Sequence, residues 1–185
     1  LYPCISFFIP FITFAQITRD LASKASVPIG LHLDHSSSYE EILFAIKEGF
    51  TSVMADGSGL DFDKNIEFVR QVTKAAHAMG VDVEAELGRV GSASNADDFV
   101  NSQCYTRCED VPVYIERTEV DCLAIAIGSA HGNYIATPKL DLERLSEINS
   151  ITDIPLVLHG GTGIPEDQLV GAVRSGINKL NIGTE

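Results

Sequence analysis

Side chains that can bind a metal ion or move a proton stand at the ends of several short apolar runs. Histidine ends three of these runs, at His35, His131 and His159. Carboxylates or an amide stand at equivalent positions: Asp34, Asp56, Glu86 and Asn181. A single residue of this kind can be explained by a purely structural role, as a helix cap or as a hydrogen-bonded residue at the end of a strand. Three imidazoles with nearby carboxylates instead favour a catalytic zinc or similar divalent site with positions open to a substrate.

The adjacent pair Asp34 and His35 shows the two interpretations most clearly. The run before it, residues 27–33, carries Val, Ile and Leu with a proline only near its start, which is typical of a strand covered on both faces. An acid and an imidazole at its end would be an acid/base group beside a metal ligand. Alternatively, Asp34 caps the following helix and His35 is a satisfied boundary residue. Of the other histidines, His32 is expected to face the helix layer and His77 to lie on a helix surface.

The elements that must position these residues alternate between strand and helix, with short connections. One expected strand ends at residue 35, and five others cover 51–55, 81–86, 122–127, 155–158 and 179–182. A further strand is expected within 4–14. The expected helices cover 14–25, 38–49, 61–80, 110–117, 141–149 and 165–175. Ser38 and Glu41 have the spacing of a capping box at the start of the second helix.

This alternation predicts a parallel sheet with crossover helices. A closed barrel fits better than an open doubly wound sheet, because polar groups end nearly every strand instead of gathering at one switch point. The predicted fold class is therefore α/β, a TIM (β/α)8 barrel that forms a single domain over 1–185. We expect it to be incomplete at both ends, since an early strand and the last helix are not recognisable and residues 1–14 are atypical.

Composition narrows the class of protein. The chain has 185 residues, of which 45% are hydrophobic and 21% charged, as in globular domains. Its net charge of -13, with only 13 Lys and Arg, argues against nucleic acid and anionic membranes as partners. The four cysteines lack the spacing of a zinc knuckle or redox motif, so a reducing, cytoplasmic location is expected.

Glycines follow the last two strand ends. The turn 159–163 reads HGGTG and precedes a helix, and the turn 181–184 reads NIGT. Bare backbone N–H groups at a helix start, together with the hydroxyl of Thr162, can form an anion cradle. Barrels often bind phosphate in the loops after strands seven and eight. Beside a metal-binding histidine, such loops suggest a phosphorylated substrate that chelates the metal.

With these motifs in place, the chain resembles the class II, metal-dependent fructose-bisphosphate aldolase family, which includes the tagatose-bisphosphate aldolases. The motifs occur in the family's order and cover most of the chain from about residue 25: LHLDH (31–35), DGS (56–58), EAELGR (84–89), AIGSAHG (126–132), LHGGTG (158–163) and NIGTE (181–185). As a set they are highly specific for this family.

The resemblance implies a role for each motif residue. His35, His131 and His159 would hold the catalytic zinc, and Asp34 would move the proton of the hydroxyl at the bond being cut. Asp56 and Glu86 would belong to a second or alternate metal position. Dihydroxyacetone phosphate would be held by Gly132, Gly160, Gly161, Thr162, Asn181, Gly183 and Thr184. A monovalent cation near that phosphate and a homodimer or homotetramer are further expectations from the family.

The implied activity is the reversible aldol cleavage of a ketose bisphosphate, as in glycolysis and related carbohydrate metabolism. A Lewis-acidic metal makes a Schiff-base lysine unnecessary, and a carboxylate beside it can take the hydroxyl proton. Fructose 1,6-bisphosphate and tagatose 1,6-bisphosphate both fit, since they differ in the configuration of one hydroxyl. Three histidines accept zinc, cobalt or iron.

The chain departs from the family pattern at two places near the site. Ser36 stands where the family usually has glycine after the Asp-His pair. The loop that normally supplies a glutamate reads GSASNADD over 91–98, so Asp97 or Asp98 would have to replace it. Two other interpretations therefore stay open: a truncated, inactive barrel that retains metal or sugar-phosphate binding, and another metal-dependent barrel lyase acting on a different sugar phosphate.

Overall fold

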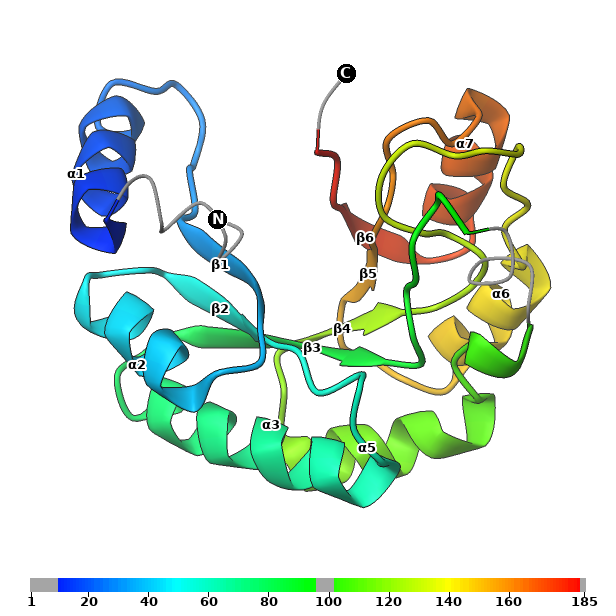
Figure 1. Cartoon of the computed structure of the whole chain (residues 1–185), viewed down its shortest axis with the longest axis horizontal. Helices are drawn as coiled ribbons and strands as arrows, with labels where there is room; N and C mark the ends of the chain where they lie inside the picture. Colours follow the sequence, from blue (N-terminus) through cyan, green and yellow to red (C-terminus); the bar gives the residue numbers. More distant parts are fainter. Residues whose placement is uncertain (1–9, 96–101, 184–185) are drawn as a thin grey trace. The chain divides into compact units, whose positions relative to one another are not determined.

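The structure, a computed structural model, describes residues 10–95 and 102–183 of the chain. These residues belong to two compact units (Figure 1). The first comprises Leu1–Ala85 and Thr118–Val120, and the second comprises Glu86–Arg117 and Asp121–Glu185. Within the described ranges, no helix combines the length and apolarity that a bilayer crossing requires.

The first unit alternates helices with parallel strands, as the sequence predicts. Its elements are α1 (Phe11–Ala22), β1 (His32–Ser36), α2 (Tyr39–Lys47), β2 (Ser52–Ala55), α3 (Phe62–His77) and β3 (Asp82–Leu87), the last two residues of β3 belonging to the second unit. Strand β2 pairs in parallel with β1 and with β3, and α2 packs against β1 and β2 (Figure 1). The fully buried side chains Leu33, Val53 and Val83 lie in register across the three strands and form an apolar row.

The start of α2 confirms one half of the predicted capping box. The Ser38 side chain accepts a hydrogen bond from the backbone N–H of Glu41 at 3.2 Å. The Glu41 carboxylate does not complete the box, because it accepts a hydrogen bond from the hydroxyl of Ser36 at 2.7 Å. The buried face of α2 comprises Ile42, Ala45 and Ile46, whereas the neighbouring Leu43 is exposed.

An extra residue interrupts β1 just before its end. The register pairs Leu33 with Val53 and Ser36 with Ala55, so β1 uses three steps where β2 uses two. The extra residue falls at the Asp34–His35 pair, and His35 has a φ of 46°, in the left-handed region. A bulge of this kind re-aims side chains. It explains how two consecutive strand residues can both serve one site, when a regular strand would point them to opposite faces.

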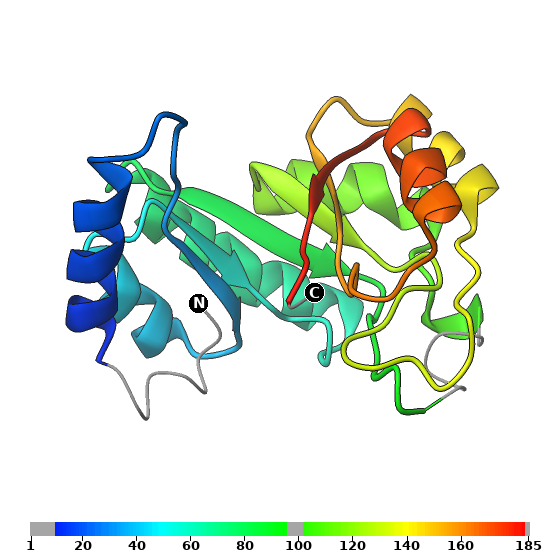
Figure 2. The same ribbon diagram turned by 90° about the horizontal axis from the view of Figure 1, so that it is seen from above.

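The second unit continues the same alternation. Its elements are α5 (Val111–Thr118, whose last residue belongs to the first unit), β4 (Cys122–Ile125), α6 (Leu142–Ser150), β5 (Leu156–Leu158), α7 (Glu166–Arg174) and β6 (Ile177–Leu180), with short 3-10 turns at Ser102–Cys104 and Cys108–Asp110. Strand β5 pairs in parallel with β4 and β6. Helices α6 and α7 lie side by side (Figures 1 and 2).

Several predicted elements differ from the observed ones in their bounds, and two of these differences concern where an element begins. The first helix begins at Phe11, not at 14, because Pro10 takes the N-cap position and its carbonyl accepts from the N–H of Phe14. Since Phe11 to Phe14 lie in α1, a strand reaching residue 14 is excluded; residues 4–9 lie outside the described ranges. Phe11 is buried, and its ring centroid lies 5.5 Å from that of Phe50. The last strand begins at Ile177, directly after Gly176, two residues earlier than predicted.

Candidate functional site

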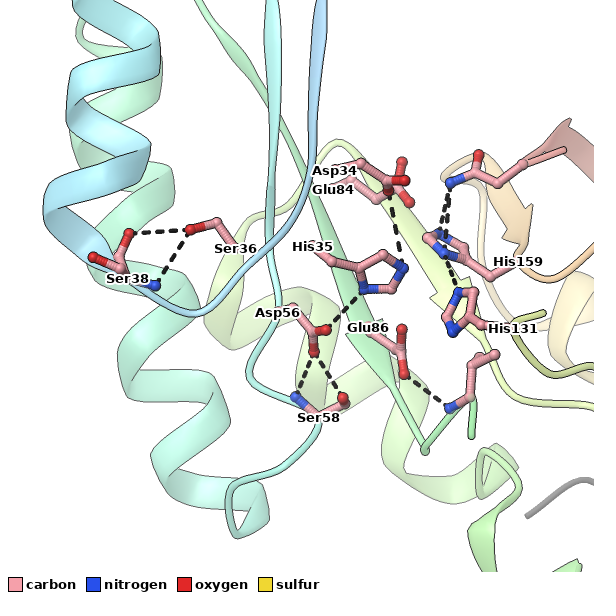
Figure 3. Close-up of polar contacts among 12 residues, drawn as sticks. Asp34, His35, Ser36, Ser38, Asp56, Ser58, Glu84, Glu86, His131 and His159 are labelled. Atoms are coloured by element: carbon pink, nitrogen blue, oxygen red, sulfur yellow. Dashed lines mark hydrogen bonds and ion pairs between the residues drawn. The ribbon is translucent and has the colours of Figure 1, made fainter. Parts of the chain in front are cut away.

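The first unit brings together Asp34, His35 and Asp56, which we call the acidic half-site (Figure 3). His35 Nδ1 lies 2.8 Å from Asp56 Oδ2, and His35 Nε2 lies 3.9 Å from Asp34 Oδ1. Asp34 and His35 come from the bulge in β1, and Asp56 directly follows β2. The predicted grouping of these three residues at strand ends is therefore present within this unit.

Asp56 fixes the orientation of His35. Its Oδ1 atom accepts hydrogen bonds from the backbone N–H and the hydroxyl of Ser58, at 3.0 and 2.7 Å (Figure 3). Burial alone would raise the pKa of Asp56, but the hydrogen bonds from His35 and Ser58 outweigh it and lower the pKa to about 2. The ionised carboxylate can only accept, so Nδ1 of His35 carries the proton and Nε2 is the nitrogen that could bind a metal ion.

His32 belongs to a second polar group on the strands of this unit. Its Nδ1 lies 2.8 Å from the hydroxyl of Ser52, and its Nε2 lies 3.8 Å from Glu84 Oε2. Both partners are strand residues, and His32 alternates along β1 with Leu33 of the buried apolar row. The prediction that His32 faces the helix layer is therefore wrong, whereas His77 is exposed, as predicted. Sequence reasoning missed Glu84, although its position two residues before Glu86 on the same strand was a signal.

The second unit brings His131 and His159 together, and we call these two residues the imidazole pair. His131 Nε2 lies 3.4 Å from His159 Nδ1, and the rings meet edge to face (Figure 3). His159 is fully buried. Two nitrogens bound to one tetrahedral zinc at 2.0–2.1 Å would be about 3.3 Å apart. The spacing of the pair therefore fits two ligands of a single tetrahedral metal ion.

Backbone hydrogen bonds hold His131 from both sides. Its N–H donates to the carbonyl of Gly91, and its own carbonyl accepts from the N–H of Ala93, each at 2.8 Å. The same loop follows β3, and its residue Val90 donates its N–H to the carboxylate of Glu86 in β3 at 2.9 Å; Glu86 is 1% exposed. The loop after β3 is thus tied both to a candidate acid and to a candidate metal ligand. Asp97 and Asp98, the candidate replacements for the loop glutamate, lie outside the described residues.

The glycine turns after β5 and β6 are bonded to each other. The N–H of Gly161 donates to the carbonyl of Asn181, and the N–H of Gly183 donates to the hydroxyl of Thr162, both at 3.0 Å. The Asn181 amide nitrogen also lies 3.1 Å from His159 Nε2. The two turns are therefore one connected assembly beside the imidazole pair, and two of the N–H groups proposed for an anion cradle already have protein acceptors.

Two further residues of the predicted phosphate group differ in their surroundings. A β-carbon at Gly160, which has a φ of 66°, would overlap the carbonyl of Ala130, so only glycine fits there. Gly132 has a φ of 99° and open space where a β-carbon would project. Thr184 lies outside the described residues.

Comparisons with known proteins agree on one family. Residues 4–185 match the family model described as fructose-bisphosphate aldolase class-II. The chain is 47% identical over 161 residues to the fructose-bisphosphate aldolase of Geobacillus stearothermophilus, covering 86% of this chain and 55% of that protein. The chain thus spans little more than half the length of this curated relative.

Solved structures give the same result. The crystal structure of the YdjI aldolase from Escherichia coli K12 matches with a TM-score of 0.86 and 34% identity, over 98% of this chain and 63% of that chain. The fructose-bisphosphate aldolase of Campylobacter jejuni matches with a TM-score of 0.72 and 28% identity, over 93% of this chain and 56% of that chain. These matches confirm the predicted α/β fold of the TIM-barrel class, present in part, and the chain belongs to the class II fructose-bisphosphate aldolase family.

Proposed function

We propose that this protein is a zinc-dependent ketose-bisphosphate aldolase. The reaction is the reversible cleavage of fructose 1,6-bisphosphate or tagatose 1,6-bisphosphate to dihydroxyacetone phosphate and glyceraldehyde 3-phosphate. One observation carries the proposal: in a chain of this family, the imidazole pair has the 3.4 Å nitrogen spacing of two ligands on one metal. A cytoplasmic enzyme of carbohydrate metabolism, assembled as a homodimer or homotetramer, is the accompanying expectation.

The proposed metal ligands are His35, His131 and His159. Asp56 supports this choice for His35, because it keeps the proton on Nδ1 and leaves Nε2 as the donor. Asp56 and Glu86 are the proposed carboxylates of a second or alternate metal position. They follow Ala55 and Ala85, which are in register on β2 and β3. Zinc bound by these histidines would supply the Lewis acidity that stabilises negative charge next to the substrate carbonyl.

Asp34 is the proposed acid/base group. Cleavage breaks a carbon–carbon bond, leaves the electron pair on the carbon next to the carbonyl, and releases the proton of the hydroxyl on the other fragment. Dihydroxyacetone phosphate forms when the carbon that holds the electron pair takes a proton from water or from an acid of the loop after β3. The Asp34 carboxylate takes this proton during cleavage and returns it during condensation. Its position supports the role, since the bulge in β1 places Asp34 Oδ1 3.9 Å from His35 Nε2. The Asp34 side chain is 20% exposed.

The proposed phosphate site lies in the glycine turns of the second unit. It comprises Gly132, Gly160, Gly161, Thr162, Asn181, Gly183 and Thr184, optionally with a monovalent cation. Open space beside Gly132 and the connected turns after β5 and β6 support it. Because Gly161 donates to the carbonyl of Asn181 and Gly183 donates to the hydroxyl of Thr162, these two N–H groups would position the turns around the phosphate.

The test is retro-aldol activity and metal content measured on one purified sample. Fructose bisphosphate and tagatose bisphosphate are each supplied before chelation, after chelation, and after zinc is restored. We expect cleavage that chelator abolishes and zinc restores. Folded protein that binds zinc but cleaves neither sugar would contradict the proposal and favour an inactive metal-binding barrel.

A further inference from the structure

The hydroxyl of Tyr134 joins the two loops that carry the imidazole pair. It accepts a hydrogen bond from the backbone N–H of Ala130 at 2.7 Å and donates one to the carbonyl of Gly160 at 2.9 Å. Ala130 directly precedes His131, and Gly160 directly follows His159. One side-chain oxygen thus links the backbone next to His131 with the backbone next to His159.

The two loops pack backbone against backbone at this point. Only glycine fits at position 160, because a β-carbon would overlap the backbone of Ala130. Ala130 is fully buried and packs with Ala93, and the Tyr134 ring lies against both. A small change in the position of either loop would therefore meet backbone atoms and would not be absorbed by flexible side chains.

The Tyr134 hydroxyl is suited to hold this contact at neutral pH. Burial raises the pKa of Tyr134, although the bond from the Ala130 N–H opposes this, so the phenol stays protonated and can donate to Gly160. Its two bonds use one donor and one acceptor position. Phenylalanine would keep the ring packing and remove both bonds.

We propose that Tyr134 is a positioning residue for the metal: its hydroxyl sets the 3.4 Å spacing between His131 Nε2 and His159 Nδ1. The proposal rests on the proposed metal site. Groups that orient metal ligands typically contribute 10–100-fold to metal affinity. Tyr134 is expected to act in this range through the backbone that adjoins each imidazole.

Cobalt titration of the wild-type protein, Tyr134→Phe and Tyr39→Phe tests this role. Tyr39 is the first residue of α2 in the first unit, so Tyr39→Phe removes the same hydroxyl from a residue that does not belong to the unit carrying the two loops. The visible absorption of bound cobalt reports the ligand geometry, and the titration gives the dissociation constant. We expect Tyr134→Phe to weaken binding roughly 10–100-fold and to change the absorption bands, with Tyr39→Phe matching the wild type.

Amide exchange of the metal-free protein separates positioning from general stability. Tyr134→Phe should speed the exchange of the Ala130 N–H, while the amides of β4 and β5 keep their wild-type rates. Binding and absorption within twofold of wild type in Tyr134→Phe would overturn the proposal. Faster exchange throughout the chain would do so as well, since it would show only lost stability. A wild-type protein that binds no cobalt would instead refute the proposed function itself, and this inference with it.

Discussion

The acidic half-site and the imidazole pair fix their histidines by different physical means. In the first, His35 is oriented by an ionised side chain, Asp56, which Ser58 holds in turn. In the second, His131 is held by backbone bonds to residues 91 and 93, and Gly160 lies against the backbone of Ala130. The first arrangement depends on charge, whereas the second depends on backbone geometry.

This difference predicts how each half responds to disturbance. A charge-dependent arrangement fails when its carboxylate is neutralised, by acid or by substitution with an amide. The backbone hydrogen bonds of a geometry-dependent arrangement do not titrate, but the arrangement fails when a loop shifts by a fraction of an ångström. The following predictions, from the largest expected effect to the smallest, test whether the two halves differ in this way.

The largest effect is expected from removing a ligand of the imidazole pair. His159→Ala should lower aldolase activity by about 10³-fold or more, because the metal's stabilisation of developing charge amounts to several kcal/mol. Steady-state assays in excess zinc check the activity, and circular dichroism checks the fold. Activity of His159→Ala within tenfold of wild type would contradict its role as a ligand.

Neutralising the proposed acid/base group should affect chemistry and leave metal binding intact. Asp34→Asn is expected to lower kcat by at least about 10²-fold, the usual contribution of a positioned general base. Zinc affinity should stay near the wild-type value, because Asp34 contributes no proposed ligand atom. Parallel measurement of kcat and of the zinc dissociation constant checks both statements. A loss of zinc affinity equal to the loss of kcat would assign Asp34 to the metal site instead.

Asp56→Asn should weaken metal binding by roughly 10–100-fold without abolishing it. The amide no longer keeps the proton on His35 Nδ1, so the ligand nitrogen is less well oriented. Ser58→Ala serves as the matched variant, since it removes one of the bonds that hold Asp56, and a smaller loss of affinity is expected. Zinc titrations of both variants and of wild type show which variant loses more zinc affinity. The reverse order of the two losses would refute the orienting role.

Acid should destabilise the metal-free protein partly through Asp56. The pKa of this carboxyl is lowered from its ordinary 3.8 to about 2, so its contribution to stability is fully present above about pH 4 and is lost as pH falls toward 2. The contribution is roughly 2 kcal/mol. Thermal unfolding of metal-free wild type and Asp56→Asn should therefore differ at pH 5 and converge by about pH 2. A difference that persists unchanged over this range would contradict the charge-dependent arrangement.

The smallest effects are expected from the helix caps, which lie outside both halves of the site. Ser38→Ala and Asp141→Ala each remove a side chain that accepts from a backbone N–H in the first turn of α2 or α6. Each should lower the free energy of unfolding by about 1 kcal/mol. Urea denaturation measures this, and zinc affinity should not change. A tenfold loss of affinity in either variant would show that the helices position the site more strongly than the local contacts do.

The sequence predicted the alternation of elements well because the signals were local. Apolar runs, the Ser38 cap and the glycines that end helices are read from neighbouring residues. The errors arose where a partner outside the recognised sequence pattern decides the outcome. Phe11 joins α1 because its ring packs against Phe50, and the Glu41 carboxylate leaves the capping box for the hydroxyl of Ser36. No local pattern contains these partners.

The candidate site likewise has residues that the sequence indicates and contacts that it does not. The residue types at strand ends indicated His35, His131 and His159, since imidazoles there are unusual. The bulge that lets Asp34 and His35 serve one site could not be predicted, because it is defined by the register of β1 against β2. Tyr134 was missed for a similar reason: its importance lies in bonds to Ala130 and Gly160, and a tyrosine in a loop gives no signal of them.

The proposed function requires that His35 and the imidazole pair bind a single metal ion. Zinc stoichiometry and affinity of wild type, His35→Ala and His131→Ala, determined by equilibrium dialysis on folded protein, test it most directly. We predict one tightly bound zinc at the proposed site per wild-type chain and its loss in both variants. If His35→Ala keeps a zinc of wild-type affinity while His131→Ala loses it, the two halves do not share a metal and the account is contradicted.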